Sequence, residues 1–336
     1  MPVLVALLGA SILVGVAFGS VAISPWTSLR LFAWKLHLTG RPAGVPESTV
    51  LILFQLRLPR VLLGAVVGAG LAAAGAVFQA LFRNPMADPA IIGVSSGAAL
   101  GAVAVMLAGG GAALGGLGVP GAAFVGALGT ALLVYRLARL GPSVQVATLL
   151  LSGIAVAAVI SAGISLVMSL SGRDIRSIYF WILGGLGSAG WRSLIAAAPF
   201  VALGLLIALA SVRDLNLTAL GEERAAQLGL EIERFKTEML ATGAVLTGAA
   251  VSVSGLIGFV GLMTPHILRL VVGADHRRLI PASVMGGASF MIMADLAART
   301  AIRPEEIPVG AVTAILGGPF FLYLLRRERK AAGVRA

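Results

Sequence analysis

The 336-residue chain contains no cysteine, and only 12% of its residues are charged. The absence of cysteine excludes disulfides, thiolate metal sites and cysteine nucleophiles. Aromatic residues are also sparse, at 6%, whereas hydrophobic residues make up 58% of the chain and the mean hydropathy is +1.00. Because a soluble domain does not need so much apolar surface, the composition predicts an integral membrane protein.

The sequence also lacks the motifs of several catalytic chemistries. It has no P-loop of the form GxxxxGK(S/T), no HExxH zinc motif and no nucleophile elbow. The three histidines, His37, His266 and His276, have no second candidate ligand at the spacing that metal sites use. We therefore expect no enzymatic activity, no cofactor and no bound metal, and we do not expect the chain to bind ATP through a P-loop.

Acidic residues are almost absent from the apolar runs, where only Glu238 and Asp295 occur, each near a predicted helix end. An ion-coupled secondary transporter usually places acidic groups inside the membrane, so this alternative function is disfavoured. The net charge of +11 does not indicate nucleic-acid binding, because the basic residues lie between the apolar runs, where membrane topology places them.

Ten apolar runs, bounded by charges, proline or glycine, are candidates for membrane-spanning helices. They are residues 3–23, 61–80, 90–108, 119–138, 144–168, 193–212, 238–257, 258–273, 279–298 and 307–325. We therefore predict an all-α protein in which residues 1–336 form one transmembrane domain, with both termini on the same side. A modest excess of Lys and Arg on that side places the termini in the cytoplasm.

Two of these runs have special features. The run 3–23 has no basic residues before it, so we expect a retained span rather than a cleaved signal peptide. The run 258–273 is short, and its Gly258, Gly261 and Pro265 predict a broken or re-entrant start. Such a start is stable only where protein surrounds it.

The segment Leu217–Lys236, LTALGEERAAQLGLEIERFK, is rich in charge and lies between two apolar runs. Its charged side chains are too costly to bury in hydrocarbon, so it must lie outside the membrane. We predict a short helix at about 215–230. Small and apolar residues fall on one side of this helix: Leu220, Gly221, Ala225, Leu228 and Gly229. A small residue lets another backbone approach closely, so the pattern predicts a docking element for an external partner.

The sequence Arg57-Leu58-Pro59-Arg60 is predicted to open the second span, because proline fits the first turn of a helix. The two arginines, three residues apart, share a helical face. They are interpreted either as interfacial anchors or as a socket for carboxylates of an external protein, which Arg299 could complete. Asp295 precedes Arg299 by four residues, so an ion pair on one helical face is expected.

Two further segments have both a structural and a functional interpretation. The sequence from Gln79 to Pro89, QALFRNPMADP, is either a tight turn between spans or a pore-mouth loop narrowed by Asn84 and Met86. The turn Gly141–Ser143 would face it as a second gate element. The segment from Ser171 to Gly185 is either an interfacial aromatic belt or a short helix dipping toward a vestibule. Its Arg173 and Arg176 mildly favour an anionic cargo.

Seven ordered motifs between about residues 50 and 325 resemble the permease subunits of bacterial ABC importers for iron-siderophores, heme and cobalamin, the FecCD family. They are RLPR at 57–60, GAVFQALFRNPMADPAIIGVSSGAALG at 75–101, LGEERAAQLG at 220–229, GLIGFVGLMTPHILRL at 255–270, ADHRRLIPAS at 274–283, ADLAAR at 294–299 and IPVGAVTAILGGPFF at 307–321. The resemblance is to permeases of the vitamin B12 and heme kind.

This resemblance implies a type II ABC importer permease in the bacterial inner membrane, with ten spans per chain. The implied partners are a second copy of the chain, two ATPase subunits, a periplasmic substrate-binding protein and membrane lipid. The cargo would be a bulky iron complex, either heme or a ferric siderophore, with cobalamin as the alternative.

The resemblance also assigns roles to individual residues. Leu220, Gly221, Glu222, Ala225, Leu228 and Gly229 would form the coupling helix that enters the ATPase. Arg57, Arg60 and Arg299 would receive carboxylates of the binding protein. Asn84, Met86 and Ser143 would form the cytoplasmic gate. Around Ser143 the family's Thr/Ser-rich turn is replaced by GPSVQVA.

Overall fold

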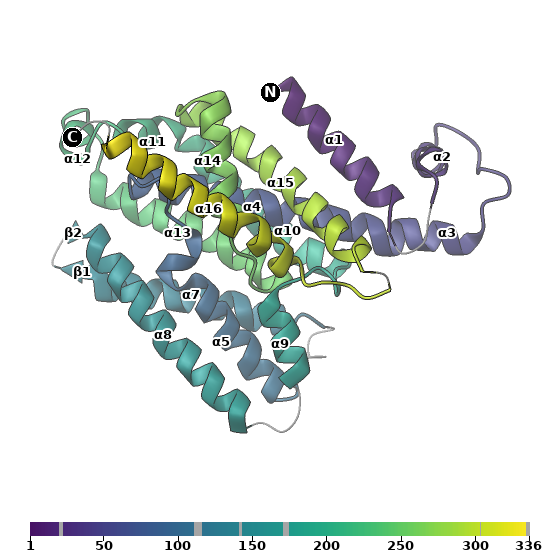
Figure 1. Cartoon of the computed structure of the whole chain (residues 1–336), viewed down its shortest axis with the longest axis horizontal. Helices are drawn as coiled ribbons and strands as arrows, with labels where there is room; N and C mark the ends of the chain where they lie inside the picture. Colours follow the sequence, from purple (N-terminus) through teal and green to yellow (C-terminus); the bar gives the residue numbers. More distant parts are fainter. Residues whose placement is uncertain (20–22, 111–115, 141–142, 171–174, 303, 334–336) are drawn as a thin grey trace.

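The computed structural model describes the whole chain except residues 20–22, 111–115, 141–142, 171–174, 303 and 334–336. Each predicted apolar run matches one long α-helix (Figure 1). These helices are α1 (Pro2–Ala17), α4 (Leu58–Leu81), α5 (Val94–Leu107), α7 (Gly118–Ala138), α8 (Val146–Leu170), α10 (Trp191–Ala210), α13 (Ile232–Ser254), α14 (Val260–Val272), α15 (His276–Thr300) and α16 (Val309–Gly333). The prediction of an all-α membrane fold is therefore confirmed, although α1 ends at Ala17, before the end of its apolar run.

Shorter elements connect these helices. They are α2 (Pro25–Lys35), α3 (Glu47–Leu51), the π-helix η1 (Ile52–Arg57), the 3-10 helix η2 (Pro89–Ile92), α9 (Ile175–Leu183), α11 (Val212–Thr218) and α12 (Glu222–Gln227). The strands β1 (Arg139–Leu140) and β2 (Ser143–Val144) pair as an antiparallel hairpin. By length and hydropathy alone, five helical stretches of the described residues can span a membrane: Glu47–Leu81, Gly118–Ala138, Val146–Leu170, Trp191–Ala210 and His276–Thr300.

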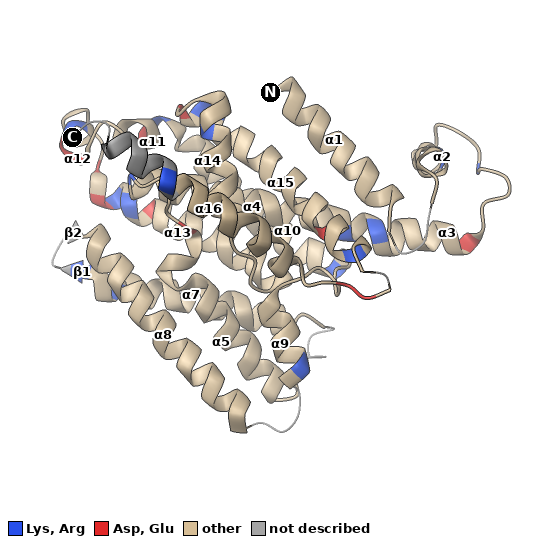
Figure 2. Ribbon diagram, in the orientation of Figure 1, with Lys and Arg blue, Asp and Glu red and all other residues tan. Residues whose placement is uncertain are grey.

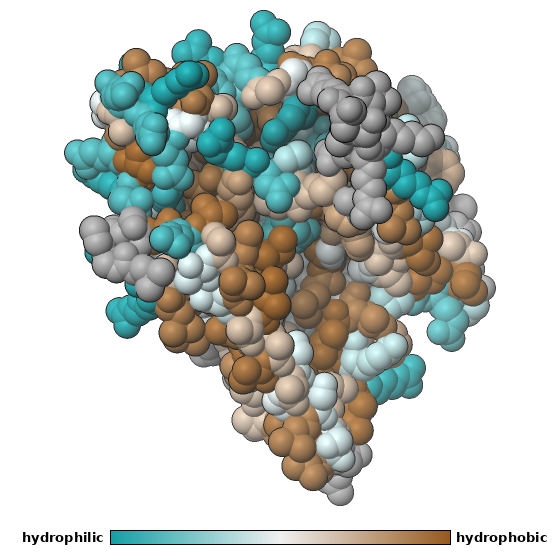
Figure 3. Space-filling model, turned by 60° about the vertical axis from the view of Figure 1, so that its left-hand side comes forward, coloured by the Kyte–Doolittle hydropathy of each residue, from teal (hydrophilic) through white to brown (hydrophobic). Residues whose placement is uncertain are grey.

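The helix bundle has two chemically distinct ends. One end carries α11, α12 and the β1–β2 hairpin, and we call it the α12 end. The other carries α2, α3, α9 and the loop after α15, and we call it the α9 end (Figure 1). Charged residues gather at these two ends, while the middle of the bundle is almost uncharged (Figure 2). A broad hydrophobic surface lies below the hydrophilic α12 end (Figure 3), as a membrane-embedded protein requires.

Both chain termini point toward the α12 end. Leu4 of α1 packs against a cluster that includes Leu279 and Ala282 near the start of α15, while Arg299 near the end of α15 bonds to Gly15, so α1 and α15 run parallel. In α16, Gly317 lies against Phe259 and Phe320 lies against His266, so α16 runs parallel to α14. The start of α1 and the end of α16 therefore lie on the same side of the bundle.

The helix of the second span begins earlier than predicted. The elements α3, η1 and α4 form one continuous helical stretch of 35 residues, Glu47–Leu81, so Arg57 to Arg60 lie within this helix and not at its start. Pro59 lies inside the stretch, directly after the π-helical turn of η1. Proline lacks the N–H that an α-helix needs, and a π-turn is one way to absorb this irregularity.

Helix α4 is the centre of the bundle, and glycines let other helices approach it closely. A Cβ added to Gly68 would lie 2.1 Å from the carbonyl oxygen of Gly287 in α15. One added to Gly75 would lie 1.8 Å from the carbonyl oxygen of Gly261 in α14. Small residues at such crossings allow the van der Waals contact that holds helices together in lipid.

Helix α14 has the broken start that its sequence predicts. The chain leaves α13 at Gly255, with φ of +67°, and re-enters a helix after Phe259, whose φ is also +67°. The side chain of Gln79 in α4 donates hydrogen bonds to the carbonyls of Leu262, at 3.1 Å, and Gly261, at 3.4 Å. Residues 260–266 are buried, so protein surrounds this irregular entry as the bilayer requires.

Candidate functional site: the two ends of the bundle

Two helices, α4 and α15, and the loop after α15 bring two arginines and two carboxylates together at the α9 end. Arg60 of α4 donates to Asp295 of α15 from Nε, at 3.0 Å, and from Nη2, at 2.8 Å. Its Nη1 and Nη2 also donate to Glu306, at 3.1 and 2.9 Å. Arg299 Nε lies 3.2 Å from Asp295 Oδ2, which confirms the expected i,i+4 pair. The side chain of Asp295 is 2% exposed, so one buried carboxylate is shared between two guanidinium groups.

Arg57 and Arg299 also cap the end of α1. Arg57 Nη1 donates to the carbonyls of Val16, at 3.1 Å, and Ala17, at 2.7 Å. Arg299 Nη2 donates to the carbonyl of Gly15. The last carbonyls of a helix have no partner within the helix and form the negative end of its dipole. Arg57 and Arg299 therefore donate hydrogen bonds to the last carbonyls of α1, and these bonds connect the end of α1 to η1 and α15.

This arrangement bears on the predicted docking socket. Arg57 and Arg299 are 5% and 6% exposed, and both point into the protein rather than to a partner or to the lipid–water interface. Arg60 is 14% exposed, and the outermost member of the cluster is Glu306, with 47% of its side chain exposed. The docking role of the three arginines stays a prediction, and direct contact of Arg57 or Arg299 with an external carboxylate would require them to leave these bonds.

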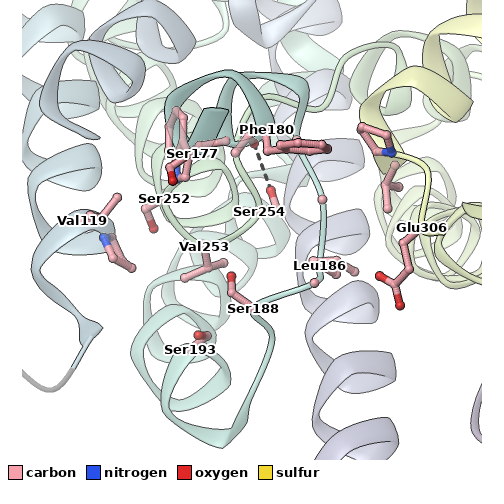
Figure 4. A pocket seen from close by; sticks show the side chains of 18 of the residues that line it. Val119, Ser177, Phe180, Leu186, Ser188, Ser193, Ser252, Val253, Ser254 and Glu306 are labelled. Atoms are coloured by element: carbon pink, nitrogen blue, oxygen red, sulfur yellow. Dashed lines mark hydrogen bonds between the residues drawn. The ribbon is translucent and has the colours of Figure 1, made fainter. Parts of the chain in front are cut away.

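A cavity of about 490 Å³ opens beside Arg60 and Glu306. The lining comes from α7, α9, α10, the loop after α9, the end of α13 and the segment before α16. Its polar groups are mainly serine hydroxyls, from Ser177, Ser188, Ser193, Ser252 and Ser254 (Figure 4). Val119, Phe180, Leu186 and Val253 provide apolar walls (Figure 4). Little in the sequence indicates this cavity, because serines scattered over several helices form no motif.

Helix α9 confirms the prediction of a short helix in the segment from Ser171 to Gly185. Phe180 and Trp181 line the cavity, while Tyr179 is 54% exposed. The guanidinium carbon of Arg176 lies 5.7 Å from the Phe180 ring centre, in a cation–π contact. Arg173 lies outside the described residues.

At the α12 end, the predicted coupling helix is divided into α11 and α12. Gly221, with φ of +106°, breaks the helix, and Gly229, with φ of +90°, follows its end. Ala225 is 0% exposed and packs inward against the chain itself. Its predicted place on the docking side stays a prediction, and direct contact with a partner would require this segment to rearrange. The apolar side chains that do face outward are Leu220, 51% exposed, and Leu228, 59% exposed.

The α11–α12 segment is tied to two long helices by charged and polar contacts. Lys236 Nζ of α13 lies 2.7 Å from Glu222 Oε2 of α12 and 3.2 Å from Glu233 Oε1. Asn216 Nδ2 of α11 donates to Asp275 Oδ1 at 2.7 Å. Hydrogen bonds from the Arg277 backbone N–H and the Asn216 amide hold the pKa of Asp275 below its usual value. A displacement of the α11–α12 segment would therefore act directly on α13, through Glu222, and on the start of α15, through Asn216.

The loop after α4 lies beside this segment. Asn84 Oδ1 accepts a hydrogen bond from the Met86 backbone N–H at 2.9 Å, so Asn84 shapes the loop while remaining exposed. Met86 is half-buried. A Cβ placed on Gly221 would lie 4.0 Å from Arg83 Nη1, which brings the coupling segment next to the end of α4.

The predicted second gate element is partly described. Ser143 begins strand β2, but its side chain and residues 141–142 lie outside the described residues. The backbone N–H of Val144 donates to Glu233 Oε2 at 2.9 Å. Glu233 also contacts Lys236, so the hairpin and α12 share one ion-pair network.

Comparison with known proteins identifies the family. A model of the FecCD transport family matches residues 7–327. The chain belongs to the FecCD transport family. The cobalamin import system permease protein BtuC of Halobacterium salinarum is 48% identical over 91% of this chain and 81% of its own length. The hemin transport system permease protein HmuU of Yersinia pestis is 43% identical over 83% of this chain and 84% of its own length.

Solved structures agree with this assignment. A structure described as an inward-facing conformation of a metal-chelate type ABC transporter matches with a TM-score of 0.83 and 31% identity, over 96% of this chain and 97% of that chain. PsaBC from Streptococcus pneumoniae has a TM-score of 0.57 at 15% identity, over 79% of this chain and 90% of that chain, which is a likeness of fold alone. The FecCD chain is a membrane permease subunit of an ABC importer and not an enzyme.

The buried carboxylate of the arginine cluster yields a test of stability. Replacing Asp295 with Asn leaves Arg60 and Arg299 without their shared counter-charge, and breaking a buried ion pair costs about 3–5 kcal/mol. Replacing Glu306 with Gln should cost only about 0–1 kcal/mol, because this pair is half exposed. Unfolding titrations in detergent measure both variants, and equal stabilities of the two would contradict the central role of Asp295.

Proposed function

We propose that two copies of this FecCD permease form the membrane domain of an importer for a bulky metal chelate. The α12 end faces the cytoplasm and contacts two ATPase subunits, and the α9 end faces a substrate-binding protein. The observation that carries this proposal is the polarity of the bundle. The α12 end carries a compact charged segment, and the α9 end carries a cavity beside an ion-pair cluster. The family match over residues 7–327 supports the same assignment.

The coupling segment would transmit movement through its ion pairs. We infer that Leu220 and Leu228 contact the ATPase, since they are the exposed apolar side chains there. Lys236 carries the displacement of α12 into α13, and Glu233 carries it to the β1–β2 hairpin. The loop at Asn84 and Met86 and the hairpin at Ser143 then act as the gate at the cytoplasmic face.

The charge of the cavity bears on the cargo. Arg60 is already paired with Asp295 and Glu306, so no free cation of this cluster remains to attract an anionic chelate. A lining of serine hydroxyls and apolar side chains suits a neutral molecule with many amide groups, such as a corrinoid. The 48% identity to a cobalamin permease agrees with this choice. Heme and ferric siderophores, the cargo first predicted, remain the competing candidates.

Reconstitution in proteoliposomes with the cognate ATPase and binding protein tests the proposal. ATPase activity should be stimulated by the binding protein loaded with a corrinoid, and less by the same protein loaded with heme or a ferric siderophore. Stimulation by heme or a siderophore alone would exclude the corrinoid but retain the importer. Uptake driven by a proton gradient without ATPase subunits would contradict the importer itself.

The Lys236 network gives a second test in the same assay. Replacing Lys236 with Met removes the contact between α12 and α13, and we expect transport to fall about tenfold, the effect of roughly 1.4 kcal/mol of lost coupling. Arg234 is the matched control, because it is 73% exposed and forms its ion pairs with Glu231 and Glu238, close to it in the sequence. The Arg234→Gln variant should transport normally, and equal losses in both variants would contradict the coupling role.

A further inference from the structure

The α9 end carries a helix whose outward face does not suit water. Helix α2 buries Ser28 and Leu31 against the bundle, at 3% and 0% exposure. On its other face Trp26 is 68% and Leu29 is 44% exposed. Immediately after it, Leu36 and Leu38 are 67% and 74% exposed, so large apolar side chains line the free side of this whole segment. Helix α2 stands out from the rest of the bundle in Figure 1.

Cations accompany these apolar side chains. Residues 24–46 contain Arg30, Lys35 and Arg41 and no acidic residue. Arg30 and Lys35 are exposed, while Arg41 pairs with Glu47. A helix with exposed Trp and Leu beside Lys and Arg is typical of segments that lie in the plane of a membrane surface. Its charge complements the phosphate groups of phospholipids.

The position of α2 along the bundle is fixed by Phe54 of η1. The rings of Phe32 and Phe54 are 5.4 Å apart, and Lys35 Nζ lies 5.9 Å from the Phe54 ring. Trp191, the first residue of α10, donates its indole N–H to the Phe54 carbonyl at 3.0 Å. Tryptophan is enriched where a membrane meets water, so Phe54 marks that level on the bundle.

Two further observations support the position of Phe54 at the boundary between membrane and water. All four tryptophans of the chain, Trp26, Trp34, Trp181 and Trp191, lie at the α9 end. From Leu81 to Phe54 the helical stretch rises by about 40 Å at 1.5 Å per residue, which matches the thickness of about 40–45 Å of a bilayer with its headgroups. Helix α2, held at Phe54, therefore lies at the depth of the headgroups.

An apolar groove lies between α1 and α2. It has a volume of about 80 Å³, and Leu13, Val14, Ala17, Phe18, Pro25, Ser28, Leu29 and Phe32 line it. Phe18 at its edge is 48% exposed. Leu29 belongs to both the groove and the exposed face of α2, so the apolar surface extends from α2 onto the apolar helix α1.

We propose that α2 lies in the lipid–water interface at the α9 end and binds anionic phospholipid. Trp26 and Leu29 enter the region where headgroups meet acyl chains, and lipid chains cover the groove between α1 and α2. Arg30 and Lys35 lie beside lipid phosphates. The interface thereby holds α2 against Phe54. Phe54 lies one helical turn before Arg57, which caps α1.

Spin labels on single cysteines test this proposal, and the cysteine-free chain needs no background substitution. We would label Leu29→Cys on α2, Glu305→Cys in the exposed loop after α15 and Leu203→Cys in the middle of α10. The full importer is placed in vesicles of phosphatidylethanolamine and phosphatidylglycerol. Collision with a water-soluble nickel chelate should be several-fold lower at position 29 than at position 305, and collision with oxygen should lie between those at positions 305 and 203.

Three results would overturn the proposal. The label at position 29 could be as accessible to nickel as the label at position 305, which would place α2 in water. It could be shielded only when the binding protein is added, which would make this face a protein contact. Spin–spin broadening between two labels at position 29 would instead place a second copy there.

The cations give an independent readout in detergent. Phosphatidylglycerol should raise the melting temperature of the native chain, and this rise should be smaller in the Arg30→Gln, Lys35→Gln double variant. Phosphatidylcholine and inorganic phosphate should not produce the same rise. An equal response of the native and variant chains to phosphatidylglycerol would contradict recognition of lipid phosphate by these two residues.

Discussion

The bilayer allows polar chemistry only at the two ends of this protein, and one helical stretch connects them. The stretch from Glu47 to Leu81 carries Arg57 and Arg60 near one end and reaches the Asn84 loop at the other. Its middle is packed through Gly68 and Gly75 against the backbones of α15 and α14. Because no charged network of the described residues crosses the centre, communication between the ends must travel through packed helices.

The two ends are built from different contacts. At the α9 end a buried carboxylate, Asp295, holds two arginines that also cap α1. At the α12 end the ion pairs of Lys236 involve partly exposed carboxylates, which are 39% and 48% exposed. Breaking buried pairs is costly, whereas exposed ones rearrange easily. The α9 end is therefore the firmer of the two, and α12 is the part better suited to move.

The sequence predicted the fold well because its signals were strong and local. Long apolar runs located the helices, Gly258 and Pro265 indicated the broken start of α14, and the charged segment after Leu217 located α11 and α12. The errors concern tertiary context. Proline at position 59 suggested a helix start, but a π-turn accommodates it within a longer helix. The sequence could not specify which way Ala225, Arg57 and Arg299 point, because their orientation depends on neighbours distant in the chain.

Site prediction was limited for the same reason. The serines of the cavity come from α9, α10, α13 and a loop, and only the fold brings them together. The interfacial character of α2 also emerges only after folding, when Leu31 turns inward and Trp26 and Leu29 turn outward. Residue roles inferred from a family motif remain predictions until the side chains are seen, as the inward-facing Arg57 illustrates.

The sidedness of the bundle underlies every functional proposal and can be measured directly. Leu228 at the α12 end is 59% exposed, and the side chain of Glu306 at the α9 end is 47% exposed. A single cysteine at either position should therefore be accessible to a labelling reagent. In right-side-out vesicles a membrane-impermeant maleimide should label position 306 at once and position 228 only after permeabilisation. Labelling of position 228 in intact vesicles would contradict a cytoplasmic coupling segment and the importer mechanism built on it.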